Sequence, residues 1–137
     1  MKVFLKILAA VVTVCMLSAC GQSTETGADT PDIRAWLYKL GWECGAFIES
    51  VTVTIPMQNE AVFREYNRLQ LQNGYDLTPY CGRQVTRYSC EIVNHPRAEG
   101  REVTANVLVY ENTIIGGDIM VTALDGFMHG LCAYPGE

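Results

Sequence analysis

Two strands and a turn are expected in VTANVLVYENTIIGGDIMVTAL, residues 103–124. The strands are predicted at Val103–Tyr110 and Thr113–Leu124, and Glu111-Asn112 forms the link between them. A link this short joins strands that pair antiparallel. Gly116-Gly117 lies within the second strand, where it predicts a bulge that lets the backbone bend.

The residues before this stretch add two helices and two strands. The first helix begins at Thr30-Pro31-Asp32, with the Thr30 hydroxyl as its expected N-cap, and stops at Gly41. The other elements are Glu49–Ile55 (strand), Glu60–Asn73 (helix) and Arg83–Val93 (strand). The order helix, strand, helix, three strands predicts an α+β domain. We expect a four-stranded, mainly antiparallel sheet with both helices packed on one face.

The N-terminal residues resemble the export signal of bacterial lipoproteins. Lys2 and Lys6 precede an apolar run of about eleven residues, which is the length of a signal-peptide core. Leu17-Ser18-Ala19-Cys20 resembles the lipobox, in which cleavage falls just before the cysteine and its thiol is joined to diacylglycerol. The resemblance implies a signal peptide over residues 1–19 and lipidation of Cys20. Residues 20–30 hold no large apolar side chain and predict a flexible tether, followed by a single domain over residues 31–137.

Composition narrows the classes of partner. Removal of residues 1–19 leaves all fifteen acidic residues and eight of the ten basic ones, a formal net charge of about −7. This charge argues against binding of nucleic acid and against electrostatic binding to anionic lipid. We therefore expect membrane attachment through the Cys20 lipid, at the extracytoplasmic face of the cell membrane.

Four further cysteines favour disulfides, because an even count is typical of exported domains. A Cys81–Cys90 bond is excluded, since nine residues of strand would hold them more than about 20 Å apart. From the expected strand order we predict Cys44–Cys81 and Cys90–Cys132. The alternative is Cys44–Cys90 with Cys81–Cys132. Zinc is disfavoured because the sequence has no Cys-x-x-Cys pair and no recognised histidine spacing.

Three stretches carry a family resemblance over most of the expected domain. They are GWECGAFIESVTVTIP (41–56), VFREYNRLQLQNGYDLTPYCGRQVTRYSCEIVNHP (62–96) and ANVLVYENTIIGGDIMVTALDGFMHGL (105–131). Together they resemble a family of small Gram-positive lipoproteins known as a bacterial domain of unknown function. The resemblance, which spans Trp36–Leu131, implies one extracytoplasmic domain and supplies no reaction, substrate or catalytic residue.

The one candidate catalytic arrangement uses His129 as a general base. Asp118 or Asp125 would orient it, and Ser89 or another hydroxyl would be the nucleophile of a small hydrolase. No Gly-x-Ser-x-Gly turn supports this alternative, and Asp125-Gly126 is also typical of a simple turn after a strand. We therefore expect no catalytic activity.

The sequence predicts neither a cofactor nor a metal. Gly116-Gly117 precedes a strand rather than a helix and so predicts no phosphate-binding loop. A calcium loop is not predicted either, because the required spacing is absent from the candidate ligands Glu111, Asp118 and Asp125. Six tyrosines with Trp36 and Trp42 could line a ligand groove or the edge of a core (Tyr66, Tyr75, Tyr80, Tyr88, Tyr110, Tyr134). The sequence thus predicts a lipid-anchored binding or accessory module whose partner is an envelope protein, a peptide or a small ligand.

Overall fold

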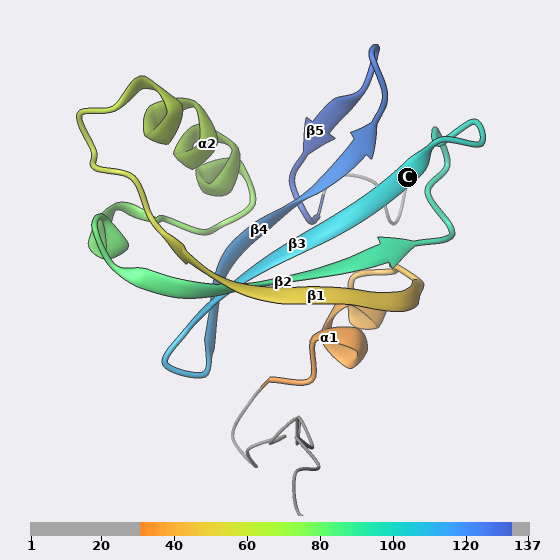
Figure 1. The fold of residues 1–137 in the computed structure, drawn as a ribbon, viewed down its shortest axis with the longest axis horizontal. Helices are drawn as coiled ribbons and strands as arrows, with labels where there is room; N and C mark the ends of the chain where they lie inside the picture. The colour runs from red at the N-terminus through yellow and green to blue at the C-terminus, as the bar shows by residue number, and fades with distance from the viewer. Residues whose placement is uncertain (1–30, 133–137) are drawn as a thin grey trace, which may run out of the picture.

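The computed structural model describes residues 31–132, without the side chains of residues 46–48. The elements are α1 (Ile33–Lys39), β1 (Cys44–Thr54), α2 (Ala61–Gln72), the 3₁₀ helix η1 (Thr78–Tyr80), β2 (Gln84–Ile92), β3 (Glu102–Tyr110), β4 (Thr113–Thr122) and β5 (Phe127–His129). The expected signal peptide, the tether and Cys20 lie outside the described residues. The two helices and the twisted sheet confirm the α+β class (Figure 1).

The strands form one antiparallel meander in the order β1-β2-β3-β4-β5. The sheet has five strands rather than the four predicted. The extra strand, β5, has only three residues and pairs with Ile119–Val121 after the chain turns at Gly126. Three residues are too few to show the alternating pattern by which strands are recognised in sequence.

The two helices lie on opposite faces of the sheet, so the prediction that both pack on one face was wrong (Figure 1). Ile33 and Leu37 of α1 belong to an apolar cluster that includes Val107 of β3. Phe63 of α2 belongs to a second cluster that includes Leu108, the next residue of β3. Successive strand residues point to opposite faces. Because the sheet is apolar on both faces, the apolar stripe of a helix does not reveal which face it covers.

A one-residue bulge in β4 decides which of its side chains faces α1 and which faces α2. Val109 pairs with Ile114, but Leu108 pairs with Gly116, so Ile115 is the extra residue. A shift of one residue moves every later side chain to the other face. Without the bulge Asp118 would point into the α1 core, whereas here it shares the α2 face with Asn106, its cross-strand partner. The sequence predicts a bulge at Gly116-Gly117, and the structure has it one residue earlier, at Ile115.

The predicted end of the first helix is confirmed, but its predicted start is not where α1 begins. Gly41, with φ of 92°, follows the C-cap Leu40. The N-cap is Asp32, whose side chain accepts a hydrogen bond from the Ala35 amide at 3.0 Å. The predicted cap, Thr30, lies outside the described residues.

The disulfide is Cys44–Cys90, with Cα atoms 6.1 Å apart, and Cys81 and Cys132 are free thiols. The predicted pairs Cys44–Cys81 and Cys90–Cys132 were therefore wrong. They assumed that the second helix carries the chain across the sheet, so that β1 and β2 begin at the same end. Instead α2 and η1 return the chain to the end that it left, and Thr54 pairs with Gln84. Antiparallel pairing then places Cys44 beside the far end of β2 and Cys90.

Candidate functional site

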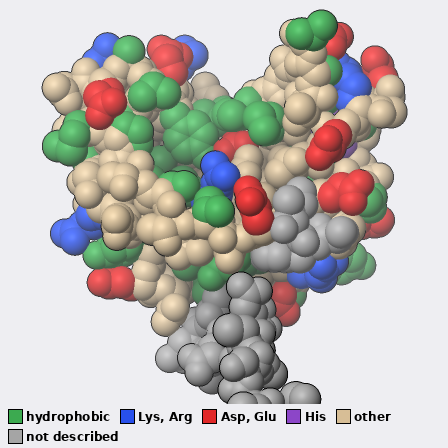
Figure 2. Space-filling view, in the orientation of Figure 1, with side chains coloured by type: hydrophobic (Ala, Val, Ile, Leu, Met, Phe, Trp, Pro, Cys, Tyr) green, Lys and Arg blue, Asp and Glu red, His purple; other side chains and the backbone are tan. Residues whose placement is uncertain are grey.

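The sheet face that carries α2 is hollowed by two adjoining cavities, which we call the α2 groove. The first, about 400 Å³, is lined by Val62, Glu65, Tyr66, Arg68, Leu69, Gln72 and Met128. The second, about 320 Å³, extends beneath α2 to the end of β1 and shares Val62, Tyr66 and Met128 with the first. Figure 2 shows a hollow with hydrophobic side chains between α2 and the β4–β5 hairpin. Cavities of this size with mostly apolar walls are typical of small-ligand sites.

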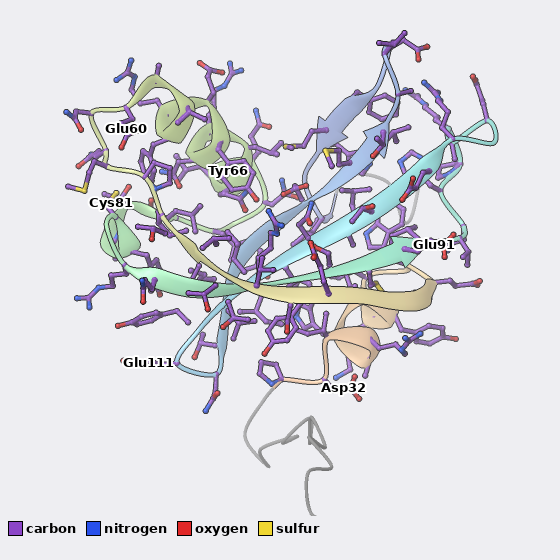
Figure 3. All side chains as sticks on the ribbon, viewed as in Figure 1. Asp32, Glu60, Tyr66, Cys81, Glu91 and Glu111 are labelled. Atoms are coloured by element: carbon purple, nitrogen blue, oxygen red, sulfur yellow. A yellow bond between two sulfur atoms is a disulfide. The ribbon has the colours of Figure 1, made fainter. Side chains whose placement is uncertain are left out.

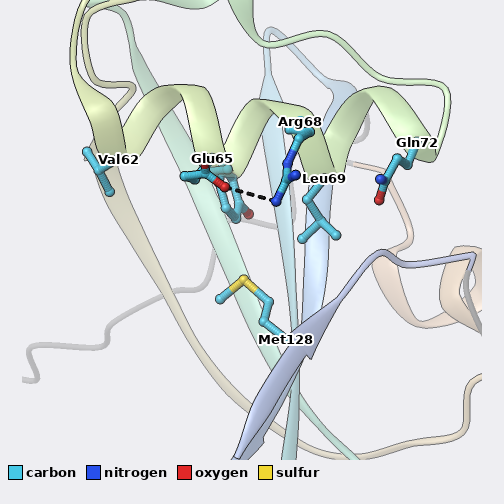
Figure 4. A pocket seen from close by; sticks show the side chains of 7 residues that line it. Val62, Glu65, Arg68, Leu69, Gln72 and Met128 are labelled. Atoms are coloured by element: carbon cyan, nitrogen blue, oxygen red, sulfur yellow. Dashed lines mark hydrogen bonds and ion pairs between the residues drawn. The ribbon is translucent and has the colours of Figure 1, made fainter.

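The walls of the groove come from α2 on one side and β5 on the other. Val62, Tyr66 and Leu69 recur at helical spacing and line the first cavity, whereas Phe63 belongs to the apolar core and lines only the second. Met128 lies opposite them on β5 (Figure 4). Val62 and Met128 are 63% and 45% exposed, so both sides of the groove present apolar surface to solvent. Such surface marks interaction sites when it is rimmed by polar groups, here the Glu65–Arg68 ion pair.

A row of hydrogen-bonded polar side chains reaches the floor of the second cavity, which Asn106 and Asp118 line. Ser89, Asn106 and Asp118 are cross-strand neighbours on β2, β3 and β4. The Ser89 hydroxyl donates to Asn106 Oδ1 at 2.7 Å, and Asn106 Nδ2 donates to Asp118 Oδ1 at 3.0 Å. Tyr66 projects from α2 toward the sheet (Figure 3) and donates its hydroxyl to Asp118 Oδ2 at 2.6 Å. Both Asp118 oxygens are thus occupied by donors within the fold.

Burial raises the pKa of both partners in the hydrogen bond between Tyr66 and Asp118. Asp118 is 3% exposed. Burial raises the pKa of the Asp118 carboxyl, while the hydrogen bonds from Tyr66 and Asn106 and the nearby Arg87 charge act in the opposite direction. Burial, followed by the charge of Asp118 and the bond to it, raises the pKa of Tyr66 far above its ordinary value. Tyr66 therefore remains a neutral hydrogen-bond donor at physiological pH.

Gln70 fixes the distance between α2 and the edge of β4. Its Oε1 accepts a hydrogen bond from the Gly117 amide at 2.8 Å, although Gln70 is fully buried. Any side chain at Gly116 would meet the Gln70 amide group, and one at Gly117 would collide with the Asn106 carbonyl and Leu131. The two glycines thus let α2 approach β4 closely enough for this bond to form.

Arg87 is the charged group at the groove floor with spare hydrogen-bonding capacity. It lies on β2, in line with Leu108 of β3, and its side chain lines the second cavity. Its Nη2 lies 3.4 Å from Glu49 Oε1, and its buried Nε has no hydrogen-bond partner among the described residues.

The proposed hydrolase residues lie in separate surroundings. His129 pairs with Ile119 across β4 and β5, whereas Asp118, one residue earlier, points to the opposite face of the sheet and is bonded to Tyr66. Asp125 lies at the exposed turn before β5, where its carboxylate is 3.4 Å from Arg101. Ser89 lies on β2, where its hydroxyl donates to Asn106 and does not contact His129. The structure therefore does not assemble His129 with Asp118 and Ser89 as a catalytic unit.

His129 instead pairs with His95, which the sequence analysis did not connect to it. Their Nε2 atoms are 2.9 Å apart, and Trp42 packs against both rings. His95 Nδ1 accepts from the Arg97 amide, so neutral His95 carries its proton on Nε2 and donates to His129 Nε2. His129 Nδ1 then donates to the Gly130 carbonyl at 2.8 Å. Burial lowers the pKa of both histidines, as expected for a neutral pair.

Nothing local in the sequence marked the groove, because its walls come from residues far apart in the chain. Arg87, Val62 and Met128 were missed. The available signal was the pair of polar residues, Asn106 and Asp118, within otherwise apolar strands. Tyr66 was among the aromatic residues considered for a ligand groove, and the structure places it there.

Residues 31–132 contain neither a side-chain cluster that could hold a metal ion nor a helix that could cross a membrane. No three histidine, cysteine, aspartate or glutamate side chains in this range converge on a point where they could hold a metal ion. Neither helix of the range has the length and apolar character that crossing a bilayer requires.

Fold and groove together define a small α+β domain built on an antiparallel meander, with one sheet face only partly covered by a helix. The chain belongs to the family described as domain of unknown function DUF4830, whose profile matches residues 36–119. This confirms the resemblance to a domain of unknown function. No curated protein and no solved structure shows significant similarity to the chain.

Proposed function

We propose that this protein is a binding module of the bacterial cell envelope, anchored through a lipid on Cys20, which holds its ligand in the α2 groove. The observation that carries the proposal is the groove itself. Apolar side chains from α2 and β5 face each other above a floor of hydrogen-bonded polar groups. An apolar cavity with a few convergent polar groups is the usual form of a ligand site.

The anchoring part of the proposal rests on the sequence. A charged start, an apolar core and Leu17-Ser18-Ala19-Cys20 follow in the order expected of a lipoprotein signal. Two acyl chains on Cys20 would hold the protein stably at a membrane surface. Metabolic labelling with a fatty acid should mark the wild type and not Cys20→Ala, and label that persists in the variant would refute anchoring at this residue.

A pair of tryptophan substitutions on α2 tests the groove. Val62→Trp places a bulky ring at an exposed residue that lines both cavities. Leu71→Trp is the matched control on the same helix, at a residue that lines neither cavity. Both positions are more than half exposed, so neither change should alter stability by more than about 0.5 kcal/mol.

The assay compares what each full-length protein retains from an extract of native envelope, with small molecules and proteins both identified by mass spectrometry. We expect at least one component to be retained by the wild type and by Leu71→Trp and to be lost with Val62→Trp. If every retained component is indifferent to Val62→Trp, the groove is not the binding site.

A further inference from the structure

On the floor of the α2 groove, each side-chain oxygen of Asp118 and Asn106 already accepts a hydrogen bond, whereas Arg87 keeps a donor without a partner among the described residues. Both oxygens of Asp118 accept bonds, from Tyr66 and from Asn106. Asn106 Oδ1 is taken by Ser89. Arg87, in contrast, lines the same cavity with a buried Nε that has no partner among the described residues. A ligand that brings acceptor atoms matches what this floor lacks.

The present partner of Arg87 is weakly held. The distance of 3.4 Å from Nη2 to Glu49 Oε1 exceeds the 2.7–2.9 Å that is typical of charge-assisted hydrogen bonds. Both side chains are partly exposed, at 39% and 51%, and exposed ion pairs contribute little to stability. Glu49 can therefore be displaced by another carboxylate at small cost.

Arginine is suited to such an exchange. Its planar guanidinium presents parallel N–H groups, including Nε, that match the two oxygens of a carboxylate. An unsatisfied buried donor in a native structure calls for a partner such as an ion or a ligand group. A carboxylate that bonds Nε and one terminal nitrogen would satisfy Arg87 without disturbing the Asp118 network.

We propose that the α2 groove binds small amphiphilic carboxylates, with the carboxylate on the Arg87 guanidinium and the aliphatic body between α2 and β5. This inference rests on the proposed function, because it names the ligand class of the same site. The body would lie among Val53, Leu108, Met120 and Met128, which line the second cavity with Arg87. A cavity of about 320 Å³ corresponds to about ten water-sized groups, which is the size of an eight-carbon carboxylate.

The test is an NMR titration of carboxyl-labelled octanoate into the full chain held in lipid nanodiscs, with empty nanodiscs to subtract partition into lipid. Octanol and octylammonium have the same body without the negative charge. We expect both to bind roughly tenfold or more weakly than octanoate, since hydrogen bonds to charged groups are the stronger ones. Equal binding of octanol, or tighter binding of octylammonium, would overturn the proposal.

Two substitutions should act in opposite directions. Arg87→Gln should weaken octanoate binding roughly tenfold or more, and Glu49→Gln should strengthen it because the competing carboxylate is gone. Glu49 is exposed, so its variant should fold even if Arg87→Gln does not. Octanoate affinity that is unchanged or lower in Glu49→Gln would refute the assignment. N-acetyl-leucyl-leucine carries its carboxylate at the end of a short peptide. If it binds more tightly than octanoate, the carboxylate site is supported and its natural ligands are the C-termini of peptides.

The two levels of the proposal can fail separately. If octanoate does not bind but Val62→Trp still loses an envelope component, the ligand class is wrong and the binding function stands. If octanoate binds equally well to wild type and Val62→Trp, the carboxylate is not held in the groove and this inference fails.

Discussion

Replacing Tyr66 with phenylalanine tests whether the polar floor of the α2 groove is a single bonded network. The change removes one oxygen atom, which donates to Asp118 Oδ2 at 2.6 Å, and keeps the ring. Since Asp118 is 3% exposed, water cannot readily replace the lost donor. Leaving a buried acceptor unsatisfied costs about 1–3 kcal/mol. For a domain of this size, each kcal/mol corresponds to about 4–8 °C in melting temperature.

The stability that Tyr66→Phe loses relative to wild type should depend on pH, and the direction of this dependence follows from the pKa of Asp118. Burial raises the pKa of this carboxyl, and the hydrogen bond from Tyr66 opposes the rise, so removing Tyr66 raises the pKa further. A group whose pKa is higher in the folded than in the unfolded state loses its stabilising contribution as pH rises through the folded pKa. The difference between wild type and Tyr66→Phe should therefore be largest at neutral pH and should shrink as pH falls toward 4.

Urea unfolding at pH 7 and pH 4.5 measures both effects, with Tyr38→Phe as the matched control because Tyr38 is 71% exposed. A double-mutant cycle with Asp118→Asn isolates the bond, since side chains in contact couple by about 0.5–3 kcal/mol. Equal stability of wild type and Tyr66→Phe at pH 7, or a deficit that grows in acid, would show that the two side chains are not bonded as described.

Three further outcomes are expected. Without reduction, Cys81 and Cys132 should be the only described thiols that react with an alkylating reagent. The Cys44–Cys90 bond closes a loop with a sequence separation of 46, so its reduction should lower the free energy of unfolding, measured in urea, by about 4 kcal/mol. A peptide map that links other cysteines would contradict this. Burial lowers the pKa of His95 and His129, so their contribution is fully present above the unfolded value of 6.5 and is lost as pH falls below it. His129→Gln should flatten this loss between pH 7 and pH 5, and an unchanged slope would count against the histidine pair. Gly117→Ala should lower the melting temperature by several degrees because its methyl group meets the Asn106 carbonyl, whereas an unaltered melting curve would mean that the backbone yields freely there.

The sequence predicts most elements of this fold closely because their signals are local. The helix expected at Glu60–Asn73 is observed at Ala61–Gln72, and the strand pair around Glu111-Asn112 has the expected bounds to within two residues. Alternation, helical spacing and a two-residue turn each operate within about a dozen residues. The strand order followed from the short links between β2, β3 and β4.

What the sequence does not predict depends on long-range geometry. The path of the chain from Thr54 to Gln84 decides whether β1 and β2 run parallel or antiparallel, and hence which cysteine meets Cys44. The α2 groove likewise forms only where Val62 of α2 and Met128 of β5 face each other across the cavity that both line. Reasoning about His129 failed because His129 pairs with Ile119 across β4 and β5, and Asp118, the residue before Ile119, therefore points to the opposite face of the sheet.

Because β4 contains one extra residue, the side chains that face the groove depend on the number of residues in the β3–β4 hairpin as well as on their type. A substitution at Ile115 changes one side chain beneath α2 and leaves every later residue on its face. Deletion of Ile115 would exchange the faces of the rest of β4, sending Asp118 toward the α1 core and Ile119 toward the groove. A relative with one residue fewer in this hairpin would therefore need the opposite polar and apolar alternation after the turn to keep the same groove.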